Sequence, residues 1–229
     1  MPFNSETFQS AFSVDCNIFA FSGGKLQILL IKRAEEPFKN QWALPGALVN
    51  IDENLRDAPI RSLKELTGLE NVFLEQVFTF GKVDRHPAGR VITVAYYSLI
   101  NKDNVTPQAS SFAQDVKWHN IDDITDLAFD HYEIMNVCLK RLRESVRRRP
   151  IGFELLSKTF TLSDVQDLYE AILNKKLDKR NFRKKILSLK ILEDIAEYQQ
   201  NVAHRPAKLY RFNLERYEEF NANGFDFEL

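Results

Sequence analysis

The stretch from Leu44 to Leu69, LPGALVNIDENLRDAPIRSLKELTGL, constrains the fold of this chain more than any other. Its pattern is typical of a loop that leads into a helix. Gly68 stands where that helix ends, because glycine adopts the left-handed backbone conformation of a C-cap without strain. Pro59 is unexpected there, since a proline beyond the first turn removes a helix hydrogen bond.

The spacing of this stretch resembles the Nudix box, the loop and helix with which Nudix hydrolases bind metal. When Gly68 and Leu69 are aligned with the end of that pattern, four more positions match: Glu53, Arg61, Leu63 and Glu65. Three positions depart from it. The opening glycine is Ala47, and two glutamates of the metal-binding end are Ser62 and Leu66.

The resemblance implies a Nudix fold, and the replaced glutamates predict that its hydrolase activity is lost. Nudix hydrolases cleave a diphosphate linked to another group and use Mg²⁺, which prefers oxygen ligands in octahedral geometry. Glutamates at i, i+3 and i+4 share one helix face. In this chain those positions hold Ser62, Glu65 and Leu66, a poor set of ligands. We therefore expect no catalytic residue, no bound metal and no cofactor.

The residues around the box predict an α+β fold. Alternating or continuous apolar patterns predict five strands: Ala11–Phe21, Leu26–Arg33, Val72–Phe80, Val91–Ile100 and Lys117–Asn120. Strands that enclose one helix give a layered sandwich. Their order resembles the Nudix fold, an α/β/α sandwich, over nearly the whole N-terminal half.

The resemblance also implies where a ligand pocket lies, namely beside the box and next to the loop after the following strand. In this chain that loop is Gly81–Arg90, and it offers Asp84, Arg85, His86 and Arg90 for bonds to hydroxyls or phosphates. Trp42 and Phe80 are candidates for stacking on a ligand. The alternatives are a solvated hairpin tip for the loop and a place in the core for the aromatic residues. We expect His119 and His131 to lie away from the box, as structural residues.

Charge is distributed unevenly along the 229 residues. Between Lys140 and Lys190, 15 lysines and arginines stand against 6 aspartates and glutamates, a net charge of +9. The whole chain carries −1, so the remainder carries −10. This asymmetry predicts an acidic domain joined to a basic surface.

A helix over Phe129–Arg149 is predicted to join the two domains. Ile134, Cys138 and Leu142 form its apolar stripe, and basic residues coat the rest. The basic residues at its C-terminal end are suited to contact phosphates. An equal alternative is that they face solvent, because positive charge at this end interacts favourably with the helix dipole. Pro150 marks the boundary, so the domains are residues 1–149, including this connecting helix at 129–149, and residues 150–229.

The second domain has the order of elements of a winged helix-turn-helix. Short helices are predicted over Ile151–Lys158, from Thr161 or Ser163 to Leu173, and from Asp178 or Lys179 to Leu189. A tight turn joins the last two. A hairpin follows, with strands Ile191–Glu197 and Ala207–Phe212, as in a wing, and Glu215–Leu229 predicts a closing helix and tail.

The basic residues of the last helix and the wing are the predicted DNA contacts. The helix contributes Lys179, Arg180, Asn181, Arg183, Lys184 and Lys185, and the wing contributes His204, Arg205 and Lys208. Arg183 and Asn181 are the candidates for base edges, since they can bond guanine and adenine. Lys184, Lys185, Arg205 and Lys208 are candidates for phosphate contacts.

A Nudix-like domain followed by a winged helix resembles the Nudix-related transcriptional regulators of bacteria. The resemblance implies a homodimer that binds a palindromic operator in double-stranded DNA and senses a small molecule. One branch responds to ADP-ribose and controls NAD cofactor genes, and another responds to sugars such as L-arabinose. The eroded box suits a neutral sugar better than a diphosphate, so we expect a sugar-responsive repressor that is not an enzyme.

Two rival functions remain open. The first is an active hydrolase of the ADP-ribose pyrophosphatase type, or an ADP-ribose-responsive regulator of NAD metabolism. The second is a module whose basic face binds an acidic protein or RNA. The N-terminus lacks a signal-peptide pattern, and no apolar run reaches membrane-spanning length, so we expect a cytoplasmic location without membrane contact. Cys16 and Cys138 indicate neither a disulfide framework nor zinc.

Overall fold

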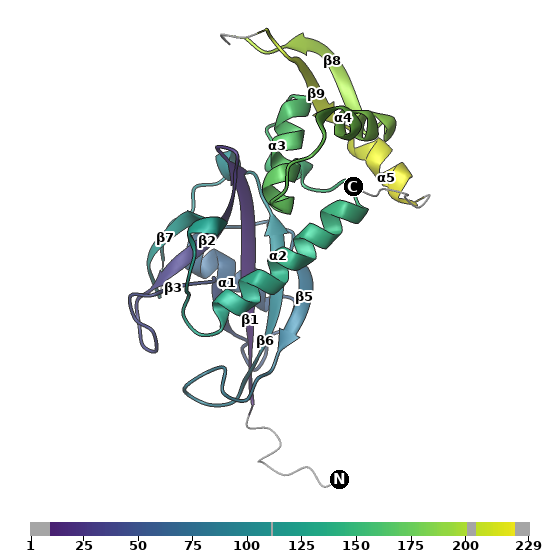
Figure 1. The fold of residues 1–229 in the computed structure, drawn as a ribbon. Helices are drawn as coiled ribbons and strands as arrows, with labels where there is room; N and C mark the ends of the chain where they lie inside the picture. Colours follow the sequence, from purple (N-terminus) through teal and green to yellow (C-terminus); the bar gives the residue numbers. More distant parts are fainter. Residues whose placement is uncertain (1–9, 111, 201–204, 223–229) are drawn as a thin grey trace. The chain divides into compact units, whose positions relative to one another are not determined.

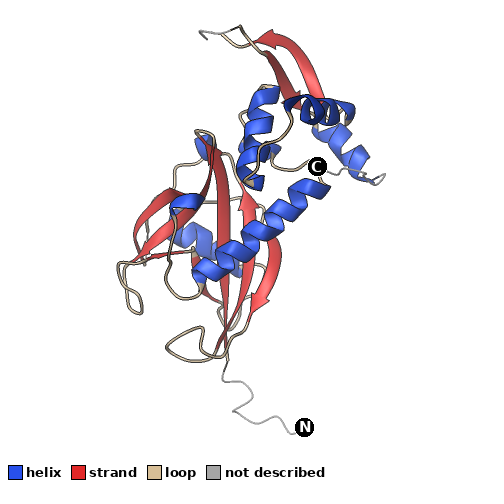
Figure 2. Cartoon of the chain, viewed as in Figure 1, coloured by secondary structure: helices blue, strands red, loops and turns tan. Residues whose placement is uncertain are grey.

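A computed structural model describes residues 10–110, 112–200 and 205–222 (Figures 1 and 2). These residues form two compact units. One contains the chain up to Ala20 together with Gln27–Arg141, and the other contains Phe21–Leu26 together with the chain from Leu142 onward. The division crosses helix α2 (His131–Arg148), so this one helix contributes residues to both units.

The first unit is built on a seven-stranded mixed sheet with the order β3-β2-β1-β6-β5. Two further strands lie off this path, where β4 pairs with β1 and β7 pairs with β2. The central pair, β1 and β6, is parallel, and its register places Ala11 opposite Val91 and Phe19 opposite Leu99. The strands are β1 (Ala11–Ser22), β2 (Lys25–Arg33), β3 (Trp42–Ala43), β4 (Gly46–Leu48), β5 (Glu75–Phe80), β6 (Val91–Leu99) and β7 (Ala113–Asn120).

β1 is buried on both faces, which explains its apolar sequence. On one face, Cys16 and Ile18 pack in a cluster with Leu63 of helix α1 (Ala58–Thr67). Successive side chains of a strand alternate between faces, so Asp15 lies on the opposite face. Figure 1 shows α2 crossing that face in front of β1 and α1 behind the sheet. The predicted α/β/α sandwich is therefore confirmed.

Three predicted boundaries of this unit are corrected by the structure. The helix of the box begins only at Ala58, so Pro59 lies in the first turn, where no helix hydrogen bond is lost. The strand predicted from Val72 begins at Glu75, after a left-handed residue at Asn71. β7 begins at Ala113 instead of Lys117, because its first half pairs with β2 despite a polar sequence. Short 3-10 helices η2 (Lys102–Asn104) and η3 (Ile121–Asp123) flank β7.

The second unit is a winged helix, as predicted. Its helices α3 (Leu162–Leu173) and α4 (Lys179–Ser188) precede a hairpin of β8 (Leu192–Tyr198) and β9 (Lys208–Phe212), and α5 (Leu214–Ala222) follows. Backbone hydrogen bonds in both directions between Phe160 and Tyr210 add a bridge to the hairpin. Among the described residues, no helix is both long and apolar enough to cross a membrane.

The helix predicted over Ile151–Lys158 is wrong. Only the 3-10 turn η4 (Phe153–Leu155) forms there. Gly152 has a φ of 95° and Leu156 is extended, so the backbone leaves the helical region on both sides. Phe153 instead packs into the core, where its ring stacks on that of Phe212 at a centroid distance of 4.6 Å.

The turn between α3 and α4 is held by a network at Glu170. Its carboxylate accepts hydrogen bonds from the backbone N–H of Leu177 at 3.0 Å and from Gln166 at 2.9 Å. It also pairs with Lys176 at 2.6 Å. Thr161, one of the two predicted caps, precedes α3 and forms a capping box with Asp164. These contacts fix the direction in which α4 leaves the turn.

Candidate functional site

The box residues that match the Nudix pattern are joined by one arginine. Arg61 contacts both carboxylate oxygens of Glu53 at 2.7 and 2.8 Å, and pairs with Glu65 at 3.0 Å. It also donates to the carbonyl of Leu48 at 2.9 Å. The hydrogen bond from Arg61 lowers the pKa of Glu53, and the same contact, with that to Glu65, raises the pKa of Arg61. Arg61 thus ties the loop to the helix.

Two of the three positions of α1 that would hold a metal, Ser62 and Leu66, are part of the protein core. Ser62 is fully buried, and its hydroxyl has no hydrogen-bond partner in the described structure. Leu66 packs with Ile31, Ala43 and Ala128. No group of three His, Cys, Asp or Glu side chains within the described ranges could hold a metal ion. A hydroxyl, an apolar side chain and two carboxylates paired with Arg61 do not fit the Mg²⁺ of Nudix hydrolases.

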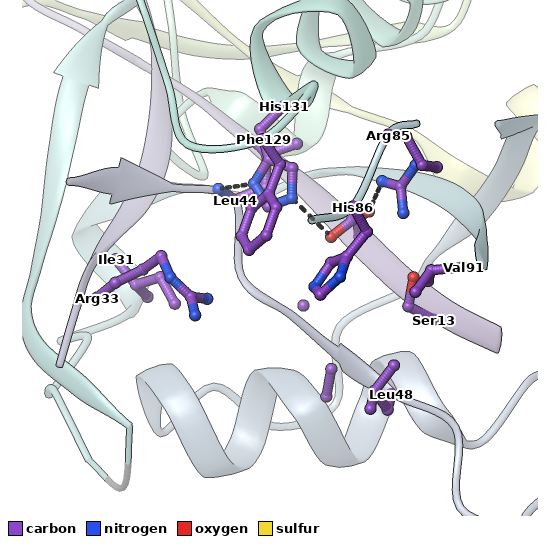
Figure 3. A pocket seen from close by; sticks show the side chains of 13 residues that line it. Ser13, Ile31, Arg33, Leu44, Leu48, Arg85, His86, Val91, Phe129 and His131 are labelled. Carbon is purple, nitrogen blue, oxygen red and sulfur yellow. Dashed lines mark hydrogen bonds and ion pairs between the residues drawn. The ribbon is translucent and has the colours of Figure 1, made fainter. Parts of the chain in front are cut away.

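A pocket of about 230 Å³ adjoins the box. It opens between β1, β2 and β4 on one side and the chain before α2 on the other (Figure 3). The residues that line it are Ser13, Asp15, Ile31, Arg33, Leu44, Gly46, Ala47, Leu48, Arg85, His86, Val91, Phe129 and His131. It combines apolar walls with two arginines, one carboxylate and two imidazoles, a mixture that suits a polar ligand with a flat apolar part.

The floor of the pocket is a buried network around Asp15. Its carboxylate accepts a hydrogen bond from Thr93 at 2.7 Å, and lies 3.3 Å from Nε2 of His131 and 3.6 Å from the guanidinium of Arg85. Nδ1 of His131 accepts from the backbone N–H of Leu44 at 3.0 Å (Figure 3). Burial lowers the pKa of His131, so the imidazole is neutral and its proton lies on Nε2, toward Asp15.

The mouth of the pocket is formed around Phe129. His86 stacks on the Phe129 ring at 5.0 Å, and the Arg33 guanidinium lies 4.9 Å from the ring centre. Arg33 and His86 point toward the same space beside that ring (Figure 3). Nε of Arg33 donates to the carbonyl of Pro37 at 2.7 Å, which orients the guanidinium. Burial lowers the pKa of His86, with Arg85 and Arg33 adding to the effect, so His86 is neutral above its ordinary pKa.

The predicted pocket residues separate into two groups. Arg85 and His86 line the pocket. The other four do not line it: Trp42, Phe80, Asp84 and Arg90. Trp42 packs edge-on against His119 at 4.4 Å, and Phe80 is buried beside Phe78. Arg90 donates to the carbonyl of Gly81 at 2.6 Å and so closes the base of its own loop.

The sequence analysis missed five polar or aromatic residues of the pocket: Ser13, Asp15, Arg33, Phe129 and His131. The prediction that His131 lies away from the site is wrong, because α2 brings it back onto β1. One signal was available in the sequence. Asp15 is an acidic residue within an otherwise apolar strand, and a buried carboxylate needs partners. Nothing local to the sequence points to Phe129, whose left-handed φ of 57° turns its ring to the pocket.

The basic face of α4 is exposed in the second unit. Lys179, Arg180, Asn181 and Lys184 are exposed, whereas Phe182 and Ile186 are buried. The side chain of Asp178 caps the helix by accepting from the backbone N–H of Asn181. Arg183, a predicted reader of bases, instead donates to the hydroxyl of Ser163 on α3 at 3.0 Å. This contact holds Arg183 against its own domain, and Lys185 is half-buried.

In the wing, Arg205 is exposed and Lys208 forms an ion pair with Asp194 on the facing strand. That contact raises the pKa of Lys208. His204 lies outside the described residues. Of these two predicted wing contacts, Lys208 already has its charge compensated and Arg205 is exposed, so Arg205 is the more available to phosphate.

Comparison with known proteins agrees with both units. Residues 11–138 match the family model of the NUDIX domain, and residues 152–212 match that of the NrtR DNA-binding winged helix domain. The ADPR responsive transcriptional repressor NtrR of Acinetobacter baylyi is 36% identical over 210 residues, which cover 90% of this chain and 83% of that protein.

Two solved structures are also similar. Shewanella oneidensis NrtR complexed with a 27mer DNA is 28% identical, with a TM-score of 0.76 over 90% of this chain and 95% of that one. The NUDIX domain of the same protein complexed with ADP ribose is 30% identical, with a TM-score of 0.56 over 61% of this chain and 94% of that one.

A Nudix fold with an eroded metal face, joined to a winged helix, defines a class of DNA-binding transcriptional regulators. The chain belongs to the NrtR-type family of this class. The expectation of the sugar-responsive branch is not supported, because the names of these relatives refer to ADP-ribose and none refers to a sugar.

Proposed function

We propose that this chain is a transcriptional repressor whose affinity for its operator is set by ADP-ribose. The observation that carries the proposal is the similarity over 90% of the chain to a repressor named as ADPR responsive. Both the sensing and the DNA-binding units fall within that similarity. The rival effector, L-arabinose, has no such support.

The pocket suits a ligand that carries phosphate and a planar ring. Nε of Arg33 donates to the carbonyl of Pro37, and in the described structure Arg33 forms no ion pair with a carboxylate. Its charge is therefore available to an anion. The neutral imidazole of His86 can donate a hydrogen bond to the same anion. The stacked rings of His86 and Phe129 give this part of the pocket a flat aromatic surface. A neutral sugar has neither an anionic group nor a planar base, whereas ADP-ribose has both.

We also propose that ADP-ribose is bound without being cleaved. The metal-binding face of the Nudix helix is filled by Ser62 and Leu66, and the two remaining carboxylates, Glu53 and Glu65, are held by Arg61. The rival reading is an ADP-ribose pyrophosphatase that uses these two glutamates. An assay with ADP-ribose and Mg²⁺ separates the two, and turnover that Glu65→Gln abolishes would establish the hydrolase.

The regulator is proposed to act as a homodimer on a palindromic operator, in the cytoplasm. Exposed residues of α4, led by Arg180 and Lys184, would approach the major groove, and Arg205 of the wing would contact the backbone. ADP-ribose changes operator affinity only if it binds one arrangement of the protein better than another.

The testing experiment is a binding selection on fragmented genomic DNA, followed by titration of the recovered operator. We expect enrichment of a palindrome and a change in operator affinity on addition of ADP-ribose, with no change on addition of L-arabinose. Enrichment without any response to ADP-ribose would refute the effector. A response to L-arabinose alone would restore the sugar branch, and uniform recovery of DNA fragments would refute specific binding.

A further inference from the structure

A buried ion pair joins the loop Gly81–Arg90 to the start of α2, behind the pocket floor. Nε of Arg85 donates to one carboxylate oxygen of Asp130 at 2.9 Å, and Nη2 donates to the other at 2.7 Å. The side chains are 3% and 13% exposed. Such a two-point contact fixes both the position and the orientation of the guanidinium.

The two partners differ in their access to the pocket. Arg85 lines the pocket, whereas Asp130 does not. Asp130 lies directly before α2, and its carbonyl accepts from the backbone N–H of Ile134. A ligand that bonds to the guanidinium therefore acts on Asp130 through Arg85, without touching it.

We propose that Asp130 is a positioning residue for Arg85, and that this ion pair transmits effector binding from the pocket to α2. The inference rests on the proposed function, in which ADP-ribose occupies the pocket. An effector oxygen that bonds to Arg85 competes with Asp130 for the same N–H donors. The beginning of α2 then loses the contact that holds it to the loop.

The charges around Arg85 make this contact sensitive to a third partner. The same guanidinium lies 3.6 Å from Asp15, so one cation is shared between two buried carboxylates. His131, the first residue of α2, is neutral and adds no positive charge. A buried charge that loses its partner destabilises the protein. An effector bond to Arg85 therefore favours a different arrangement of the buried charges around it.

α2 is suited to carry that change along the chain. It runs without interruption over 18 residues, from the cluster at His131 to Arg148. Near its other end, Nε of Arg143 donates to the carbonyl of Ile172, at the end of α3, at 2.8 Å. A single helix thus begins at the pocket cluster and contributes its last residues, from Leu142 on, to the second unit.

The structure offers a matched control pair. Lys82 and Glu133 form a second ion pair between the same loop and the same helix, at 2.7 Å. Their side chains are 64% and 48% exposed, and neither lines the pocket. Exposed ion pairs contribute little, so their loss removes a loop-to-helix contact without disturbing the buried cluster.

The experiment measures the Kd of ADP-ribose for the full-length protein with and without operator DNA. The ratio of the two values gives the coupling, and by linkage ADP-ribose changes operator affinity by the same factor. In the unmodified protein we expect a ratio of roughly 5 to 150. Asp130→Asn should bring the ratio to within about twofold of one while ADP-ribose still binds, and Glu133→Gln should leave the ratio unchanged.

Arg85→Lys is the second variant, because Asp130→Asn leaves a buried guanidinium short of a partner. Lysine keeps the charge and loses the two-point contact, so the ratio should fall toward one. Full coupling in the folded Asp130→Asn protein overturns the inference alone. If Asp130→Asn does not fold, full coupling in Arg85→Lys overturns the inference instead. No coupling in the unmodified protein refutes the proposed function together with this inference.

Discussion

At the residue scale, Gly46 lies so close to Asp15 that no side chain fits there. A Cβ on Gly46 would lie 2.3 Å from Oδ1 of Asp15 and 2.5 Å from the carbonyl of Val14. The carbonyl is backbone and cannot rotate away. We expect Gly46→Ala to lower the free energy of unfolding by about 1–3 kcal/mol, measured by denaturant titration. Gly81→Ala is the control, since its Cβ would meet only the end of Arg90 at 3.8 Å. Equal losses in both variants would contradict this explanation.

Arg33 provides a residue-scale test of the ligand. Arg33→Gln removes the charge but keeps a side chain that can donate hydrogen bonds. If Arg33 bonds to a phosphate, ADP-ribose affinity should fall by roughly tenfold or more, since hydrogen bonds to charged groups contribute about 1.5–3 kcal/mol. Isothermal titration calorimetry measures this change. Arg56→Gln removes a charge outside the pocket, where the side chain is 87% exposed, and should leave affinity unchanged. Equal affinities in the two variants would exclude the phosphate contact.

The pocket residues that could be predicted are those that lie close to a motif along the chain. Arg85 and His86 follow the box by one strand, and the resemblance to the family locates their loop. Asp15 and His131 come together only because β1 and α2 pack on each other, across more than a hundred residues. Local patterns carry no information about such a contact, so His131 was misplaced.

At the scale of elements, the helices whose sequences combine a hydrophobic period with a capping residue were predicted well. α3 and α4 have capping residues at Thr161 and Asp178, and both begin within a residue of their predicted starts. Predictions failed where a positive φ interrupts the pattern, as at Gly152 and Asn71. The sequence marks glycine as permissive of this conformation but does not require it, and tertiary packing decides.

Glu170 gives the turn between α3 and α4 a pH dependence. Its contacts, led by the hydrogen bond from Lys176, lower the pKa of Glu170 to about 2 from an ordinary value of 4.5. A lowered pKa in the folded state stabilises the protein above pH 4.5, and this contribution is lost as the pH falls from about 4.5 toward 2. Thermal unfolding at pH 5 and pH 3 should show a smaller fall for Glu170→Gln than for the unmodified protein.

Asp167→Asn is the matched control for that measurement. Asp167 lies on the same helix, but burial raises its pKa, so its contribution has the opposite sign. The control variant should therefore keep the fall in stability between pH 5 and pH 3. An unchanged pH dependence in Glu170→Gln would show that the turn network does not depend on that carboxylate.

At the scale of the whole molecule, the proposed DNA-binding and effector-binding activities are assigned to different units. Lys184→Gln removes one exposed cation of α4 and should make operator affinity less dependent on salt. One lost phosphate contact lowers the slope of log K against log salt by about 0.9. ADP-ribose affinity measured without DNA should not change. A loss of both activities would show that the two units do not act separately.

The effector was the least predictable property of the whole chain. The missing glutamates predicted a poor metal site, and they also suggested a neutral ligand, because the diphosphate was assumed to need that metal. The structure offers Arg33 and His86 near Phe129 as groups that could take the place of a metal. Only one of these three residues lies in the predicted pocket loop.

If hydrolysis is lost as proposed, Leu66 makes that loss hard to reverse in evolution. A single change back to glutamate would place a carboxylate among Ile31, Ala43 and Ala128, where it has no partner and would destabilise the core. An ancestor of this chain could lose the glutamate in one step, yet a descendant would need several compensating substitutions to regain it. Selection on such a chain can therefore change its ligand specificity far more readily than it can restore hydrolysis of a diphosphate.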